Sequence, residues 1–510
     1  MSKPRDIADS AAVINNLDNS TSNIQSQIDG INPSPVITAT ASGALANGDT
    51  VIVNSNGTVS AITGSGATES LGSNQVISSD ATTHVQVIYD TQNDKVIAFY
   101  KRSGDMYAKV CTVSGETITA GAEQTVYNNN GTVGHFAVTY VGSGKFVFMA
   151  NDSNVNGGVS AIGSVSGTTV TMGSTVQFGD NANDVEHVSI VYDENEGKVV
   201  ACWQQKVSPN QSYAAVGSIS GTTLSYGTPV SVTSQRAVFY PSSTVYDSTA
   251  QKVILCYMTF SGSEYARARV GTISGTSISF GTEATVRSAI TDDLAAVYDP
   301  DNDKTILFYR DSGSGYDLRA SVLTVSGTSL TVGTDTTITE RQARNIGAVY
   351  DTNADMTVVY FRDVEDASFG RVVNVSISGT TPTNEGELYI QTIDNDNDFN
   401  QITFDPDTNK VILASNDADN SNYPTLNTYQ APFFSSNMTA ENFIGFSDAA
   451  YSDTATATIQ VVGSVDDAQS GLTAGQKYYV QADGSLGLTA ASVSVEAGTA
   501  VSATEIIVKG

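Results

Sequence analysis

Residues 87–100 read VIYDTQNDKVIAFY: an apolar strand ending in Tyr-Asp, a polar turn, and a second apolar strand. Two apolar runs joined by a short polar turn are typical of paired β-strands. The pattern recurs at intervals of 51–54 residues, so the chain holds seven copies of one β unit. The other copies are VTYVGSGKFVFM (138–149), IVYDENEGKVVACW (190–203), TVYDSTAQKVILCY (244–257), AVYDPDNDKTILFY (296–309), AVYDTNADMTVVYF (348–361) and ITFDPDTNKVILAS (402–415).

A second motif follows in the first five units, for example VCTVSGETITAG (110–121), and a weaker form, VSISGTTPTN (375–384), follows in the sixth. Alternating apolar and polar residues around Ser-Gly indicate a tight β-hairpin. Each unit therefore supplies four strands. Four strands in a repeat of about 52 residues predict an all-β, seven-bladed β-propeller with four-stranded blades.

The ring should close with a strand that precedes the first full unit. Val76 lies 13 residues before Tyr89, as an outer-strand Val or Ile lies before the other motifs, while the seventh unit stops near Pro432 after three strands. An early strand at about 70–78 would complete the last blade and remove its exposed edge. We therefore expect the propeller over residues 69–434.

The two ends of the chain contain similar patterns. Residues 35–68 include ANGDTVIVNSNGTVSAI and residues 435–510 include TAGQKYYVQADGSLGLT, each with an apolar stretch before Asn-Gly or Asp-Gly. These patterns predict related hairpins. We expect both ends to form one small β-domain with the propeller inserted between them; two independent β-modules are the alternative.

Residues 1–34 form a predicted helical segment for attachment and oligomerisation. Apolar residues at heptad a/d spacing favour a coiled coil, and isoleucine at both positions shifts the preference toward three or more strands. A homotrimer is therefore expected; the alternative is a helix that packs on its own domain. The residues concerned are Ile14, Leu17, Ile24, Ile28 and Ile31.

The composition narrows the classes of function. The 510-residue chain has 53 acidic and 24 basic side chains, a net charge of −29, and 15% charged against 40% hydrophobic residues. An acidic chain lacks the basic footprint of nucleic-acid binding. No apolar run reaches the length of a membrane span, and the N-terminus has no apolar core of a signal peptide. We expect neither nucleic-acid binding nor membrane insertion.

The residues resemble a known family. KPRDIADSAAVINNLDNSTSNIQSQID (3–29), the Tyr-Asp and Ser-Gly repeats, and ENFIGFSDAAYSD (441–453) are similar to tail-fibre-like proteins of marine phages, notably those that infect cyanobacteria. The second unit departs from the pattern, with VGSG in place of the Tyr-Asp turn. The resemblance implies a virion structural protein of the tail or its fibres, often trimeric, with a role in host attachment and no catalytic motif.

All three histidines occupy one repeat position, five residues before the Tyr of the motif. This position lies at the start of the innermost strand, at the end of the channel where propellers usually bind ligands. A polar ring there could bind a sugar or a metal; the alternative is a residue type that merely packs well. The ring comprises His84, His135, His187, Asp293 and Asn345, with Pro241 and Phe399 at the same position in other units.

Two acidic runs resemble the start of a calcium loop. Asp394, Asp396 and Asp398 have the spacing of EF-hand ligands, but Phe399 stands where the loop needs glycine. Asp299, Asp301 and Asp303 repeat that spacing. A solvated turn is the default for both, so we expect no cofactor, with Ca²⁺ as the alternative. The aspartates of the Tyr-Asp motifs are interpreted as turn formers.

Cys202 and Cys256 share a repeat position with aromatic residues, which predicts core packing. The next position is aromatic in five units, which hold Tyr100, Trp203, Tyr257, Tyr309 and Phe361 there; such rings either fill the spaces between blades or stack on sugars. No nucleophile–base motif is present, so we expect a non-enzymatic protein.

Together these features predict a phage virion protein, tail-fibre or tail-associated, that mediates host-surface attachment through the propeller. Its expected partners are other virion proteins, a host glycan or protein, and copies of itself. The alternatives are a purely structural particle component, such as a tail nozzle or capsid decoration, and a virion-associated glycan depolymerase.

Overall fold

A computed structural model describes residues 35–129, 133–155, 157–179, 185–206, 211–260, 264–313, 315–366, 369–394, 401–490 and 494–509. The chain divides into two compact units. One is continuous, Ala67–Phe433, and the other combines Met1–Gly66 with Phe434–Gly510. The coiled-coil residues Ile14, Leu17, Ile24, Ile28 and Ile31 lie outside the described residues.

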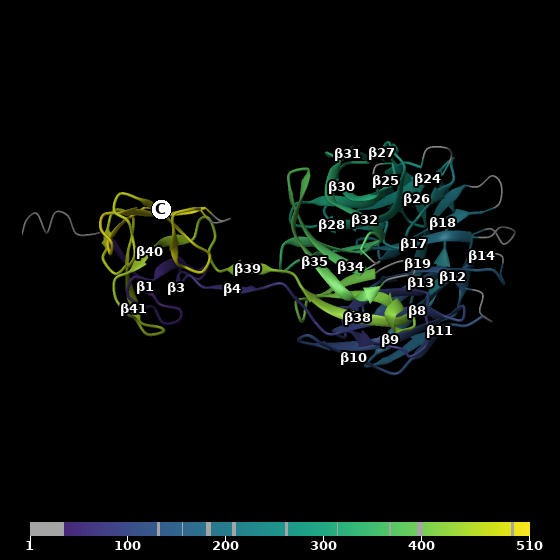
Figure 1. Ribbon diagram of the computed structural model, residues 1–510, viewed down its shortest axis with the longest axis horizontal. Helices are drawn as coiled ribbons and strands as arrows, with labels where there is room; N and C mark the ends of the chain where they lie inside the picture. Colours follow the sequence, from purple (N-terminus) through teal and green to yellow (C-terminus); the bar gives the residue numbers. More distant parts are fainter. Residues whose placement is uncertain are drawn as a thin grey trace, which may run out of the picture. The chain divides into compact units, whose positions relative to one another are not determined.

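The continuous unit is a seven-bladed β-propeller, so the predicted fold class is confirmed (Figure 1). Each blade begins with an inner strand that carries the Tyr-Asp or equivalent motif at its end. The inner strands are β7 (His84–Asp90), β12 (Val133–Tyr140), β17 (Val185–Asp193), β23 (Thr244–Asp247), β28 (Thr291–Asp299), the second half of β32 (Thr336–Asp351) and β36 (Gln401–Asp405).

The second and third strands of each blade form its buried middle. The second strands are β8 (Lys95–Arg102), β13 (Lys145–Asp152), β18 (Lys198–Gln205), β24 (Lys252–Thr259), β29 (Lys304–Asp311), β33 (Met356–Asp363) and β37 (Lys410–Asp417). The third strands are β9 (Asp105–Ser114), β14 (Gly157–Ser166), β19 (Ser212–Ser220), β25 (Ala266–Ser274), β30 (Asp317–Ser326), β34 (Phe369–Ser378) and β38 (Tyr423–Gln430).

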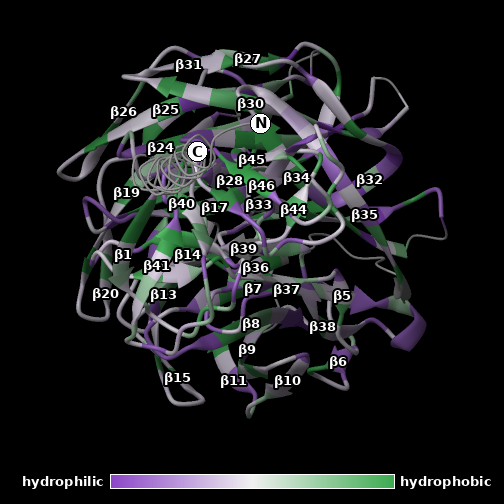
Figure 2. Ribbon diagram, turned by 90° about the vertical axis from the view of Figure 1, so that its left-hand side faces the viewer, coloured by the Kyte–Doolittle hydropathy of each residue, from purple (hydrophilic) through white to green (hydrophobic). Residues whose placement is uncertain are grey.

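Outer strands follow the Ser-Gly hairpins and often come in two pieces. Figure 2 shows outer strands such as β15, β20 and β31 at the rim and inner strands such as β7, β17 and β28 near the centre. The outer strands are β10 (Thr117–Ala120) and β11 (Gln124–Tyr127), β15 (Thr169–Met172) and β16 (Val176–Phe178), β20 (Thr223–Tyr226) and β21 (Val230–Thr233), β26 (Ser277–Phe280) and β27 (Ala284–Arg287), β31 (Ser329–Val332) with the first half of β32, and β35 (Thr381–Asp394). A further short strand, β22 (Ala237–Val238), pairs with β24, and a 3₁₀ turn, η1, covers Ala418–Asn420.

The ring closes through strands that precede the first blade. β5 (Ser70–Leu71) and β6 (Gln75–Val76) pair antiparallel with β38 of the seventh blade, with Val76 opposite Thr425. This pairing supplies the outer strand that the seventh unit lacks, as its early position in the sequence predicted. The seventh blade therefore has no unpaired outer edge at β38, the hazard that closure removes in propellers.

Seven apolar clusters hold the ring together, one between each pair of adjacent blades. The cluster between the first and second blades includes Phe99 and Phe146, whose ring centroids lie 4.8 Å apart. The cluster that closes the ring joins Val85 of the first blade to Ile412 of the seventh. Cys202 and Cys256 are fully buried, and the aromatic position that follows them is at most 1% exposed. Both positions therefore belong to the core.

The Tyr-Asp motif has two separate structural roles. Its aspartate accepts backbone N–H bonds from the turn, as Asp299 does from Asp301 and Asn302, both at 3.0 Å. Its tyrosine reaches the turn of the preceding blade, as Tyr350 reaches Asp301 at 2.7 Å. The turn-forming interpretation of the aspartates is thus confirmed.

The second unit contains strands from both ends of the chain. One of its sheets has the order β1-β41-β40-β2-β3 and the other β42-β46-β45-β43-β44. The first contains β1 (Val36–Thr40), β2 (Thr50–Val53), β3 (Val59–Ala61), β40 (Phe443–Ser447) and β41 (Thr456–Gln460). The second contains β42 (Val465–Asp466), β43 (Lys477–Val480), β44 (Leu486–Gly487), β45 (Val495–Ala500) and β46 (Ile506–Val508). The ends therefore form the predicted joint β-domain.

The two sheets of this unit are copies of one motif. The turns after β2 and β43 make the same bonds, from Gly57 N to Asn54 O and from Gly484 N to Gln481 O, both at 2.9 Å. In each copy a glycine of positive φ, Gly445 or Gly498, lies too close to the backbone of the adjacent strand to carry a side chain. The propeller is inserted in the first copy, and the segments on either side of it, β4 (Gly64–Ala67) and β39 (Phe433–Ser436), pair with each other.

Candidate functional site

The two sides of the propeller differ in their connections. On the side where the inner strands end, every turn from an inner strand to the second strand has four residues, such as 91–94, and every Ser-Gly hairpin has two, such as 115–116. On the other side, which we call the His side, the links from second to third strands range from two residues (103–104) to six (206–211). Loops that vary on a constant scaffold are where binding residues concentrate.

Both ends of the propeller lie on the side where the inner strands end, which we call the Tyr-Asp side. β38 is antiparallel to β37, which is antiparallel to β36, so β38 runs in the same direction as the inner strand and ends on the Tyr-Asp side. β5 pairs with this end of β38, where Leu71 lies opposite Tyr429. The chain thus enters and leaves the ring from one side, and the His side carries no connection to the second unit.

The three histidines lie side by side at the His side of the channel. The ring centroids of His84 and His135 are 5.4 Å apart in an edge-on arrangement, and those of His135 and His187 are 5.4 Å apart and stacked. They come from the starts of the first three inner strands. We call these three residues the histidine row.

A β-bulge explains part of the residue choice at this position. In the second, third, fifth and sixth blades the register shifts there, so that two inner-strand residues face one on the next strand. His187, Asp293 and Asn345 have φ of 47°, 49° and 55°. Among residues with a side chain, Asn, Asp and His tolerate this left-handed region best. The recurrence of these types was visible in the sequence, but the bulge was not.

Burial keeps His84 and His187 uncharged at neutral pH. Desolvation lowers the pKa of His187 to about 4, with His135 adding to the effect. The pKa of His84 is also well below its usual range, first because of burial and then because of Lys101 and His135. Neutral imidazoles can donate and accept hydrogen bonds without attracting a counter-ion.

The other members of the predicted ring lie in the fifth and sixth blades. Asp293 is buried and has Arg344 at 3.9 Å, and Asn345 is buried beside that arginine in sequence. The structure therefore brings the three histidines into contact with one another and places an acid–arginine pair in another part of the ring. Asp396, Asp398 and Phe399 lie outside the described residues, and Asp394 ends β35.

The acidic spacing at 299–303 does not gather its carboxylates around one point. Asp299 holds its own turn, Asp301 accepts the hydroxyl of Tyr350, and Asp303 accepts that of Tyr298 at 3.0 Å. Within the described ranges, no group of three His, Cys, Asp or Glu side chains is arranged to hold a metal ion. Among the residues that the structure describes, no helix is long and apolar enough to cross a membrane.

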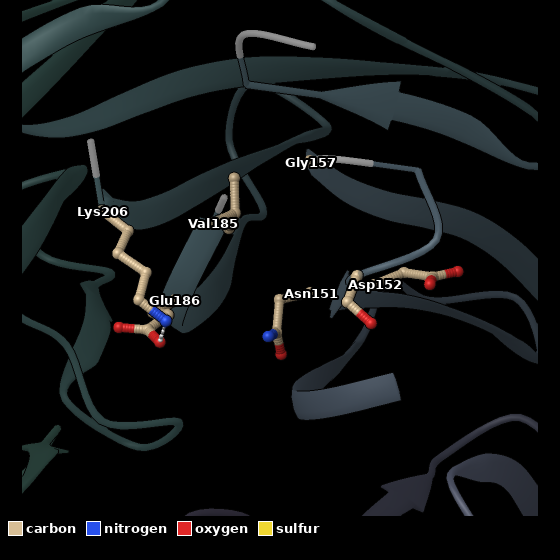
Figure 3. Close-up of a pocket in the computed structure, with 7 residues that line it drawn as sticks. Asn151, Asp152, Gly157, Val185, Glu186 and Lys206 are labelled. Carbon is tan, nitrogen blue, oxygen red and sulfur yellow. Dashed lines mark ion pairs between the residues drawn. The ribbon is translucent and has the colours of Figure 1, made fainter. Parts of the chain in front are cut away.

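A small polar cavity lies beside the histidine row between the second and third blades. It has a volume of about 90 Å³ and is lined by Asn151, Asp152, Ser153, Gly157, Val185, Glu186 and Lys206. Figure 3 shows Lys206 and Glu186, an ion pair of 2.8 Å, on one side and Asn151 and Asp152 on the other. The backbone N–H of His135 donates to Asn151 Oδ1, so a hydrogen bond joins the row to the lining of the cavity. Sequence reasoning missed this cavity because its lining comes from four separate segments.

Comparisons with known proteins found solved structures that resemble this chain at low sequence identity. No family model matches the chain, and neither does any curated protein. Among solved structures, a lectin from Burkholderia pseudomallei is 9% identical with a TM-score of 0.49, over 71% of this chain and 98% of that one. A Hadza microbial sialidase is 10% identical with a TM-score of 0.42, over 66% and 73%. A Trypanosoma rangeli sialidase is 10% identical with a TM-score of 0.36, over 66% of this chain and 58% of its own length.

Proposed function

We propose that this chain is a non-enzymatic attachment protein of a phage particle, tail-fibre or tail-associated, whose propeller contacts a glycan or protein on the host surface. The observation that carries the proposal is the difference between the two sides of the ring. One side has turns of constant length and both chain connections; the other has variable loops and the histidine row. A ring attached from one side presents the other to a partner.

The chemistry of the histidine row favours an uncharged ligand. His84 and His187 are neutral at pH 7, and their rings offer hydrogen-bonding nitrogens next to flat apolar faces. Hydroxyl groups and the C–H faces of a sugar fit such a surface. The net charge of −29 works against polyanions.

The repeated carboxylates do not supply a depolymerase with an acid–base pair. Asp90, Asp193 and Asp405 bond the N–H groups of their own turns, as Asp299 does. They also lie on the Tyr-Asp side, away from the histidine row. Attachment through residues 1–34 as a trimer is part of the proposal, and those residues lie outside the described ranges.

Immunogold labelling tests the virion part of the proposal. Antibody against residues 67–433 should label particles of the phage that encodes this chain at the fibre tips. Gold on the tail stem or capsid alone would favour a purely structural component. Particles without gold would refute the virion assignment.

A further inference from the structure

Three blades close a space near their second strand with the same polar pair. A buried tyrosine of the second strand donates to a carboxylate near the start of the last strand. The pairs are Tyr100 with Glu123 at 2.7 Å, Tyr257 with Glu283 at 2.6 Å, and Tyr309 with Asp335 at 2.7 Å. They occur in the first, fourth and fifth blades.

The third blade replaces both members of the pair. Trp203 stands at the tyrosine position, and Pro229 stands at the position of the acid, because GTP at 227–229 corresponds to GTE at 281–283. A pocket of about 220 Å³ is present at this place, lined by Gly179, Trp203, Gln205, Tyr213 and Pro229. The two replaced residues thus face a space that the first, fourth and fifth blades fill with a tyrosine–acid pair.

The indole nitrogen of Trp203 has no protein partner in this pocket. Trp203 is 1% exposed, and its Nε1 makes no hydrogen bond with any described residue. A Cβ placed on Gly179, which lines the pocket and has φ of 81°, would lie 3.5 Å from this nitrogen. The N–H therefore faces the glycine wall of the pocket. A buried donor without an acceptor is uncommon in folded proteins, and a bound hydroxyl would satisfy it.

The lining suits the two faces of a sugar. The Tyr213 ring is half-buried, lies against Trp203 with centroids 6.1 Å apart, and is held by its hydroxyl bond of 2.9 Å to Gln211. The lining residues include one amide, Gln205, and no charged side chain. An apolar cavity of about 150 Å³ takes up benzene, so a pocket of this size accommodates a six-membered ring.

We propose that this pocket, between the second and third blades, binds a neutral saccharide, with the Trp203 indole N–H donating to a sugar hydroxyl and the Tyr213 ring covering a C–H face. The inference rests on the proposed attachment function and names its ligand class and one of its sites. It is separate from the histidine row, which belongs to the inner strands.

Trp203 is the single tryptophan of the chain, so its fluorescence reports on this pocket directly. The full-length protein would be titrated with the methyl glycosides of glucose, galactose, mannose, fucose and N-acetylglucosamine. A saturable change in emission with one or more of them is expected, and no change with glucuronate, which is charged. A flat titration with every neutral glycoside would overturn the proposal.

A double variant, Trp203→Tyr with Pro229→Glu, restores the pair of the other blades. It should fold, because the first and fourth blades fold with the same two residues, and its fold can be checked by circular dichroism. Saturation-transfer NMR should show at least about a tenfold loss of affinity for the glycoside that the wild type binds. Glu194→Ala, at an exposed position of the turn 194–197 on the Tyr-Asp side, serves as a matched variant that leaves the pocket intact and should keep wild-type affinity.

The outcomes separate the pocket from the wider function. If the double variant binds the glycoside as the wild type does, the pocket assignment is wrong while glycan binding stands. If the wild type binds no glycoside by either method but the particle is labelled as described above, the saccharide inference fails and the attachment role stands. If the wild type binds no glycoside and the particles are not labelled, the saccharide inference and the proposed attachment function are both wrong.

Discussion

The hydroxyl of Tyr350 lies 2.7 Å from Asp301 Oδ2 and donates to it across the boundary between the sixth and fifth blades. Tyr298 makes the corresponding contact with Thr249 of the fourth blade at 2.8 Å. At these two boundaries the Tyr-Asp motif therefore ties a turn to the next blade as well as shaping the turn itself. Burial and Asp301 together raise the pKa of Tyr350, which keeps it a donor at any physiological pH.

Tyr350→Phe should lower the free energy of unfolding by about 1–3 kcal/mol, because the variant loses a hydrogen bond to a charged acceptor. Urea unfolding followed by circular dichroism measures this. Tyr192→Phe is the matched control, since the turn of the preceding blade, residues 141–144, carries no carboxylate. Equal losses in the two variants would show that the contact with Asp301 contributes nothing of its own.

Substitution at the bulge should separate backbone from side-chain effects. Asn345 has φ of 55°, so Asn345→Ala should be less stable than Asn345→Gly by about 1 kcal/mol, although both lose the same side chain. His84 occupies the same repeat position in the first blade, in a regular register from His84 to Asp90. There the order should reverse, with alanine more stable than glycine. Thermal unfolding of the four variants would decide, and the same order at both sites would contradict the role given to the bulge.

Stability should depend on pH through His187. The pKa of this group is about 4 in the folded chain, lowered first by burial and then by His135, against about 6.5 in the unfolded chain. Between these values the unfolded state binds the proton and the folded state does not, so stability falls as the pH drops from about 6.5 to about 4. His187→Asn keeps a residue that tolerates the left-handed backbone, and it should remove this part of the pH dependence.

The groups around His187 decide how the comparison is made. Glu186 raises the pKa of His187, while Arg236 and Lys206 lower it. Carboxyl groups in general also titrate near the lower end of this pH range. The informative quantity is therefore the difference in unfolding free energy between wild type and His187→Asn at each pH. A difference that stays constant from pH 4 to pH 7 would contradict the assigned shift.

The second unit should fold without the propeller. Thr63 and Asn437 lie beside each other, with Thr63 N donating to Asn437 Oδ1 at 2.9 Å and Asn437 N to Thr63 O at 3.2 Å. Deleting residues 64–436 joins these two directly and leaves 62–63 and 437–442 between β3 and β40, close in length to 488–494 between β44 and β45 of the second copy. The shortened chain should give dispersed amide NMR signals and a cooperative thermal transition; a spectrum without dispersion would show that the unit needs the inserted propeller.

The sequence predicted the propeller well because each blade repeats the same local signals. A Tyr-Asp turn, a Ser-Gly hairpin and alternating apolar residues occur in nearly every unit. A strand that is hard to assign in one unit can therefore be assigned by comparison with the others. Val76 could be assigned to the closing strand by its distance from Tyr89 alone. The two-copy organisation of the second unit was only partly visible, because its first copy is split by the inserted propeller.

The site was harder to predict because it depends on contacts between units. The alignment of His84, His135 and His187 at one repeat position was evident, but their direct contact depends on the width of the channel. The Trp203 pocket arises from two replacements, Trp203 and Pro229, that lie 26 residues apart. Tryptophan resembles the tyrosine it replaces and proline is common in turns, so neither replacement stands out by itself, and only the missing tyrosine–acid bond makes them significant. A residue-by-residue comparison of the repeats could have found them.

The central claim, that the His side is the binding face, can be tested by blocking each side in turn. Cys111, Cys202 and Cys256 are buried, and burial raises the pKa of Cys111 and Cys256 to about 12, so a cysteine introduced at the surface can be labelled selectively. Ser153→Cys places the label on the His side and Glu194→Cys on the Tyr-Asp side, both at exposed positions.

The measurement is binding of each full-length variant to host cells after coupling to a polyethylene glycol chain. The account predicts that the label at Ser153→Cys abolishes binding and the label at Glu194→Cys leaves it intact. Loss of binding with Glu194→Cys alone would place the contact on the Tyr-Asp side and contradict the account.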